Sequence, residues 1–110
     1  MTAAEKLTMV KTMLGIPASD TSIDADLTAY LNMAGAEILN WMYTNRTSAE
    51  RAAVTDVPTK YEIVQCHAVV NGYSHRGAEG EKVHNENGIN RQFAYDDMVA
   101  YIRSHVYQLI

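Results

Sequence analysis

The sequence predicts an all-α fold, a small four-helix bundle with one long polar loop before the C-terminal helix. Apolar residues recur every three or four positions in four separate stretches, which is the period of an amphipathic helix. Helix-capping residues precede several of these stretches. Polar and glycine residues instead gather in one run, residues 76–91. A chain of 110 residues is long enough for one hydrophobic core, so we expect a single domain over residues 1–110.

The first helix is predicted from its two ends. Thr2-Ala3-Ala4-Glu5 has the sequence of a capping box. The apolar residues that follow at helical spacing are Leu7, Val10 and Leu14. Gly15 and Pro17 then predict the end of this helix.

A longer helix is predicted from about Ile23 to Tyr43. Asp24 and Asp26 lie near its start, where the helix dipole favours negative charge. Its apolar row consists of Leu27, Leu31, Ala34, Ile38 and Trp41, with Tyr30 and Met42 beside it. This spacing is typical of an amphipathic helix with a broad buried face.

A connector and a third helix follow. The connector is predicted at residues 44–57, and Thr47-Ser48-Ala49-Glu50 within it could cap one short turn. Pro58 suits the first position of the third helix, where its missing N–H costs nothing. The apolar residues of this helix are Tyr61, Val64, Ala68 and Gly72 on one side, and Ile63, Val70 and Tyr73 on adjoining sides. A helix that is apolar on several sides is expected at the centre of the bundle.

The polar run, RGAEGEKVHNENGINR, is predicted to be a long loop. Asn87-Gly88 within it could form a hairpin turn, and residues 89–95 could form one short strand. Asp96 and Asp97 predict the start of a last helix that runs to the C-terminus. The apolar face of this helix consists of Met98, Ile102, Val106 and Leu109.

Composition excludes several classes of function. The formal net charge is −4, and the nine basic residues are scattered singly, which argues against tight binding to DNA by counterion release. No apolar run approaches the length of a membrane-spanning helix. The single cysteine, Cys66, excludes an internal disulfide and fits a reducing compartment.

Candidate chemical groups do not combine into a catalytic site. His75, Glu79, Glu81 and His84 lack any recognised metal-ligand spacing, so we expect solvated polar residues rather than a metal site. Cys66 and His67 are neighbours on a helix and point about 100° apart, which prevents a nucleophile–base pair. We therefore expect a small buried thiol, no cofactor and no enzymatic activity.

Two surfaces remain as candidates for contacts with other proteins. In the polar run, Arg76, Lys82 and Arg91 balance Glu79, Glu81 and Glu86. Balanced opposite charges suit a surface that meets a copy of itself, although a solvated loop without a partner is the alternative. At the C-terminus, Tyr107, Leu109 and Ile110 could either complete the core or dock on a partner.

The same residues resemble a known family. The stretch GAEGEKVHNENGINRQFAY, followed by a closing helix, is similar to the hallmark region of the tailed-phage head-to-tail connector family. These are small helical adaptor or head-completion proteins, which are also described as DNA-packaging proteins. The resemblance extends to a first helix ending in LGI, the DTSIDADL entry, the AGAEILNW helix and a helix opened by VPTKYE.

The resemblance implies a structural protein of the virion that assembles in the host cytoplasm. Members form rings, typically twelve-fold, beneath the portal protein. The ring extends the channel for double-stranded DNA, which passes without sequence recognition, and receives the next stopper or tail component. No membrane partner is implied. Transferred to this sequence, the inter-subunit and channel loop would consist of Arg76, Glu79, Glu81, Lys82, Glu86, Asn87, Gly88 and Arg91.

Two other functions stay open at this point. A small nucleic-acid-binding or DNA-packaging accessory module would bind DNA with an affinity that falls steeply with salt. A metal-dependent hydrolase would lose bound metal when His75 or His84 is replaced.

Overall fold

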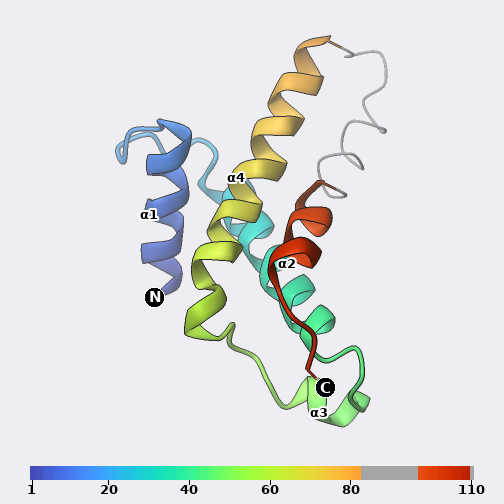
Figure 1. The fold of residues 1–110 in the computed structure, drawn as a ribbon. Coiled ribbons are helices and arrows are strands. Elements are labelled where there is room, and N and C mark those ends of the chain that lie inside the picture. Colours follow the sequence, from blue (N-terminus) through green and yellow to red (C-terminus); the bar gives the residue numbers. More distant parts are fainter. Residues whose placement is uncertain (83–96, 110) are drawn as a thin grey trace.

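The regular structure is entirely helical in the residues that the computed structural model describes, 1–82 and 97–109. The surroundings of side chains are described for residues 1–74 and 97–109. The helices are α1 (Ala3–Leu14), α2 (Asp24–Met42), the short α3 (Ser48–Ala52), α4 (Thr59–Lys82) and a C-terminal helix of residues 97–105 (Figure 1). The predicted all-α bundle is confirmed.

Local sequence signals fix the ends of α1 and α3 as predicted. The Thr2 hydroxyl accepts a hydrogen bond of 3.1 Å from the Glu5 N–H, and the Glu5 carboxylate accepts one of 2.7 Å from the Thr2 N–H. Thr47 and Glu50 repeat this reciprocal capping at α3. Gly15 has a φ of 75°, a left-handed conformation that glycine adopts without steric cost, and it ends α1.

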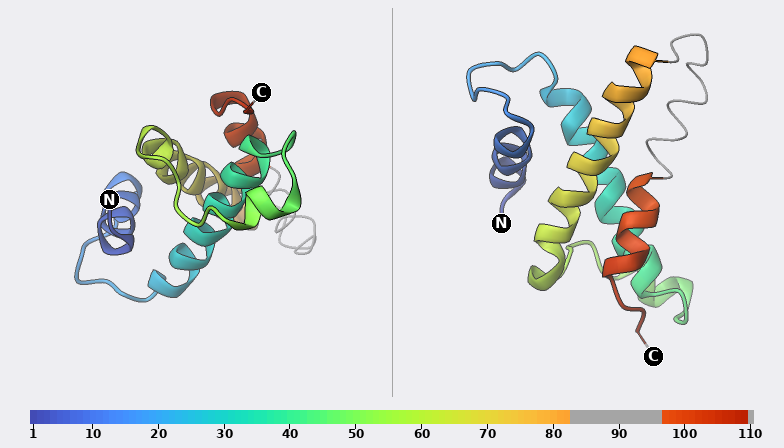
Figure 2. Two further views of the ribbon diagram at one scale, coloured as in Figure 1. Left: turned by 90° about the horizontal axis from the view of Figure 1, so that it is seen from below. Right: turned by 45° about the horizontal axis from the view of Figure 1, so that its top comes forward.

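The core lies between α2, α4 and the C-terminal helix, and α1 closes one side. α4 packs against both α1 and α2, so the prediction that it is central is confirmed (Figures 1 and 2). The apolar face predicted for the last helix is buried at Met98, Ile102 and Val106. The largest side chains that are fully buried belong to Leu27, Ile38, Met98, Ile102, Val10, Val69 and Cys66.

Lys11 ties α1 to the start of α2. Its side chain is almost fully buried, and its ammonium group lies 2.9 Å from the Asp24 carboxylate and donates a hydrogen bond of 3.3 Å to the carbonyl oxygen of Ala18. A buried ammonium group needs such partners because desolvation would otherwise disfavour its charge. The connection between α1 and α2 is therefore fixed at both ends.

Three boundaries differ from the predictions. α4 begins at Thr59, one residue after Pro58, and it continues to Lys82, so the first residues of the predicted loop are helical. Ala, Glu and Lys in this stretch are strong helix formers, and an existing helix extends at little cost per residue. The last helix stops at residue 105 instead of running to the C-terminus. The predicted strand and hairpin turn lie outside the described residues.

Candidate assembly surfaces

Residues 106–109 leave the helix because groups distant in sequence bind their backbone. The Trp41 indole donates a hydrogen bond of 2.9 Å to the Val106 carbonyl oxygen. The Tyr107 N–H donates one of 3.1 Å to the Tyr61 hydroxyl oxygen. The Leu109 N–H donates one of 2.8 Å to the Met42 carbonyl oxygen, while the Asn45 amide donates one of 3.3 Å to the Leu109 carbonyl oxygen. We call residues 106–109 the C-terminal segment; it is bound to the end of α2 and the start of α4.

This segment separates the residues that were predicted to dock together. Leu109 packs against the core, whereas the Tyr107 side chain is 83% exposed. Ile110 lies outside the described residues. The two alternatives for the C-terminus therefore apply to different residues: Leu109 completes the core, and Tyr107 is available for contact.

The residues predicted for the inter-subunit loop are divided in a similar way. Arg76, Glu79, Glu81 and Lys82 belong to the last two turns of α4, so they are not part of a loop. The remaining four lie outside the described residues: Glu86, Asn87, Gly88 and Arg91. That these charges contact a neighbouring subunit stays a prediction.

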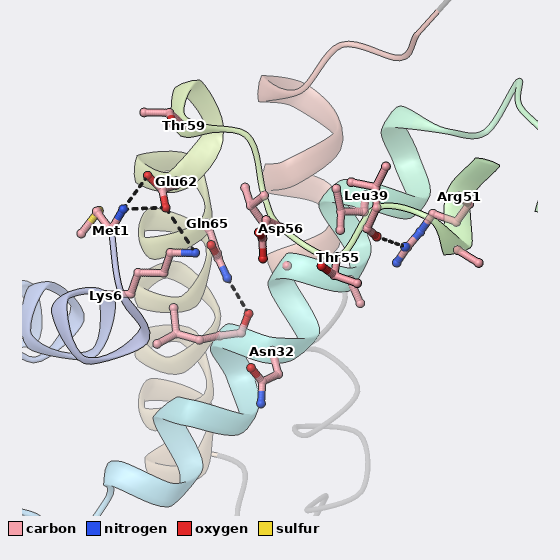
Figure 3. A pocket seen from close by; sticks show the side chains of 16 residues that line it. Met1, Lys6, Asn32, Leu39, Arg51, Thr55, Asp56, Thr59, Glu62 and Gln65 are labelled. Atoms are coloured by element: carbon pink, nitrogen blue, oxygen red, sulfur yellow. Dashed lines mark hydrogen bonds and ion pairs between the residues drawn. The ribbon is translucent and has the colours of Figure 1, made fainter. Parts of the chain in front are cut away.

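A polar cleft lies between α1, α2, α4 and the connection from α3 to α4 (Figure 3). Its volume is about 670 Å³. Glu62 on its wall accepts hydrogen bonds of 2.9 and 3.0 Å from the Met1 ammonium group, and the Lys6 ammonium group lies 3.6 Å away. These contacts, the hydrogen bond from Met1 first, lower the pKa of Glu62 below its usual value, so the carboxylate is ionised at neutral pH.

Gln65 crosses the floor of this cleft and joins α4 to α2. Its Nε2 atom donates a hydrogen bond of 2.8 Å to the Leu31 carbonyl oxygen, while its buried Oε1 has no partner among the described residues. Gly35 makes the crossing possible, because a Cβ atom there would lie 3.0 Å from Gln65 Nε2. The role of this side chain is structural, because its hydrogen bond holds α2 and α4 together.

The side chains of Cys66 and His67 point into different surroundings, as predicted. Cys66 is fully buried, which confirms the prediction of a buried thiol, and burial raises the pKa of this thiol. His67 is exposed and its ring stacks on Tyr101, with 6.4 Å between the ring centroids. A protonated, buried thiol is a poor nucleophile.

Among the residues that the structure describes, no group of three His, Cys, Asp or Glu side chains could hold a metal ion. The described helices include none that is long and apolar enough to span a membrane.

The sequence did not predict the buried polar side chains of the cleft or the hydrogen bonds that bind the C-terminal segment. Gln65 and Glu62 are buried polar residues on α4, and neither matches a motif. Tyr61 and Trp41 were predicted only as apolar residues, yet the hydroxyl of one and the indole of the other bind the C-terminal segment. A buried Tyr or Trp commonly finds such a partner, which is the one signal that could have found them.

Comparison with known proteins identifies the family of this chain. The family model of phage gp6-like head-tail connector proteins matches residues 4–105. No curated protein and no solved structure gives a significant match. Because the family model matches nearly the whole sequence, the chain belongs to the phage gp6-like head-tail connector family.

Proposed function

We propose that this protein forms a closed ring beneath the portal protein of a tailed phage. The ring extends the channel for DNA and receives the next stopper or tail component. The observation that supports this proposal is the match to the head-tail connector family over residues 4–105. The protein acts by assembly and catalyses no reaction. It is made and assembled in the host cytoplasm and ends in the virion, at the junction of head and tail.

The charge of the chain supports a channel role. Double-stranded DNA binds proteins mainly through clustered Lys and Arg residues that displace its counterions. This chain has a net charge of −4 and scattered basic residues. DNA therefore passes the ring without being held and without sequence recognition.

Balanced charges in residues 76–91 set the register between neighbouring subunits. Complementary charges across an interface suppress wrong pairings more than they add affinity. The charged residues assigned to this contact are Arg76, Glu79, Glu81, Lys82, Glu86 and Arg91. Asn87 and Gly88 belong to the same stretch. Tyr107 contacts either the portal or a neighbouring subunit.

Native mass spectrometry over a range of concentrations, with matching electron micrographs, tests the ring. Closed rings of about a dozen subunits are expected, because a heterologous interface whose rotation closes produces a ring. A monomer at every concentration would leave the proposal dependent on portal protein as a template. Failure to form a ring with added portal protein would then overturn it.

A charge-reversal variant tests the register. Glu81→Lys combined with Glu86→Lys is expected to weaken ring formation while helicity stays unchanged. The matched control is Asp26→Lys with Asp56→Lys, which adds the same charge at two exposed positions elsewhere. Rings that form equally well in both variants would remove these charges from the interface.

A further inference from the structure

Tyr107 is an exposed aromatic side chain on a fixed backbone. Its ring is 83% exposed, whereas the other large hydrophobic side chains found exposed in the described residues are exposed by 46% or less. Hydrogen bonds at the Val106 carbonyl oxygen, at the N–H of Tyr107 itself and at the backbone of Leu109 hold the segment in place. Tyr is among the side chains that most often dominate protein interfaces. This geometry is typical of a docking residue.

A complementary surface lies on the outer side of α1. It is a shallow hollow of about 560 Å³, which we call the methionine face. It consists of Met1, Ala4, Glu5, Thr8, Met9, Thr12 and Met13. Methionine side chains are flexible and polarisable, and their sulfur atoms make favourable contacts with aromatic rings. The hollow therefore suits an aromatic side chain.

The charges around the two surfaces are of opposite sign. The cations near this face are paired elsewhere. The Met1 ammonium group and Lys6 pair with Glu62, and Lys11 pairs with Asp24, which leaves Glu5, among the described residues, as the unpaired charge on the methionine face.

Two cations lie over the rings of the aromatic residues that bind the backbone of Val106 and Tyr107. The Lys60 ammonium group lies 5.1 Å from the centre of the Tyr61 ring, and the Arg103 guanidinium lies 5.0 Å from that of Trp41. Neither cation pairs with a carboxylate in the described part of the chain. The methionine face therefore carries a negative charge, whereas the side chains that bind the C-terminal segment have positive charges beside them, and these signs are complementary across a contact between two subunits.

The two surfaces lie on opposite sides of the bundle, α1 on one and the C-terminal segment on the other (Figures 1 and 2). Tyr107 therefore cannot reach the methionine face of its own subunit. We infer that Tyr107 of one subunit docks on the methionine face of the next subunit, an inference that rests on the ring proposed above. Contacts of this head-to-tail kind use two different patches on every subunit, as a cyclic assembly requires.

Complementation between two variants tests the contact. Tyr107→Ala removes the docking residue and keeps the methionine face, whereas Met13→Lys disrupts the methionine face and keeps Tyr107. Each variant alone is expected to associate at least about tenfold more weakly than the wild type, the scale of a hot-spot residue. Mixed together, they retain one intact interface between them, so native mass spectrometry should detect a heterodimer with one copy of each.

Two further variants serve as controls. Met33→Lys changes an equally exposed methionine on α2 and should leave ring formation unchanged. Tyr107→Phe keeps the aromatic ring and should retain most of the association. Circular dichroism checks that all variants keep their helices.

Photo-crosslinking identifies the surface directly. Replacing Tyr107 with p-benzoylphenylalanine places a photoreactive aromatic group at the contact, and mass spectrometry of the digested product should find it joined to α1 of another subunit. The same amino acid in place of Ser104, which is exposed on the neighbouring helix, is the control.

The outcomes separate this inference from the proposed function. Rings that form normally with Tyr107→Ala, or crosslinks that reach portal protein or another part of the chain, would overturn the contact and leave the ring standing. Wild-type protein that forms no ring, even with portal protein, would overturn both.

Discussion

The side-chain amide of Gln65 on α4 donates a hydrogen bond of 2.8 Å to the carbonyl oxygen of Leu31 on α2. This bond joins two helices across the floor of the polar cleft, where Gln65 is almost fully buried. Gln65→Ala removes the bond and leaves a space in the interface. We expect the free energy of unfolding to fall by about 1–3 kcal/mol, as measured by urea denaturation. Asn32→Ala, at an exposed position of the same cleft, should change it by less than about 0.5 kcal/mol.

Gly35 and Gln65 should show strong coupling. A Cβ atom at position 35 would lie 3.0 Å from Gln65 Nε2 and 3.5 Å from Val57 Cγ2. Gly35→Ala alone is expected to destabilise the protein, because the new methyl group displaces an amide that is held by a hydrogen bond. In a Gln65→Ala background the same substitution should be stabilising, by up to about 1 kcal/mol, since alanine favours helix. A double-mutant cycle measures the difference, and equal effects in both backgrounds would contradict the proposed contact.

Glu62 should make stability depend on acid pH. Hydrogen bonds from the Met1 ammonium group, and the nearby Lys6, lower its pKa in the folded protein below the usual 4.5. A lowered folded pKa contributes stability that is present above the unfolded pKa and is lost as pH falls through the folded one. Glu62→Gln should therefore lose less stability than the wild type as the pH falls below about 5. Asn32→Ala, at an exposed position of the same cleft and without a titratable group, should follow the wild type.

The C-terminal segment should loosen when its hydrogen bonds are removed. Trp41→Phe keeps most of the aromatic packing but cannot donate to the Val106 carbonyl oxygen. We expect a loss of about 1 kcal/mol in unfolding free energy. Hydrogen exchange should become faster at the Leu109 amide, which is bound to the neighbouring end of α2. Tyr107→Phe, which changes an exposed hydroxyl, should leave both measurements unchanged.

Helix ends with local causes could be predicted from the sequence. The capping boxes of Thr2 and Thr47 and the left-handed Gly15 depend on residues within a few positions, and all three are found. The apolar faces of α2 and of the last helix also followed from periodicity, because a buried face repeats with the turn of the helix. These features need no knowledge of the rest of the fold.

Features that depend on distant residues could not be predicted. Val106 and Leu109 keep helical spacing in the sequence, yet the helix stops before them because Trp41, Met42 and Tyr61 bind the backbone of this segment. Gln65 likewise gives no sign in the sequence that its amide is buried against Leu31. The continuation of α4 was missed for another reason. Its last turns lack an apolar period, so only the helix propensity of Ala78, Glu79, Glu81 and Lys82 indicated it.

The fixed backbone of the C-terminal segment has a thermodynamic consequence for association. A flexible tail must give up conformational entropy at every residue when it binds, and that loss subtracts from affinity. Here the backbone is already ordered in the free subunit by hydrogen bonds to α2 and α4. Docking through Tyr107 then restricts little more than the two side-chain torsions of one residue. A small contact of this kind loses little entropy when it forms. The same contact can therefore repeat between every pair of neighbouring subunits without any subunit having to refold.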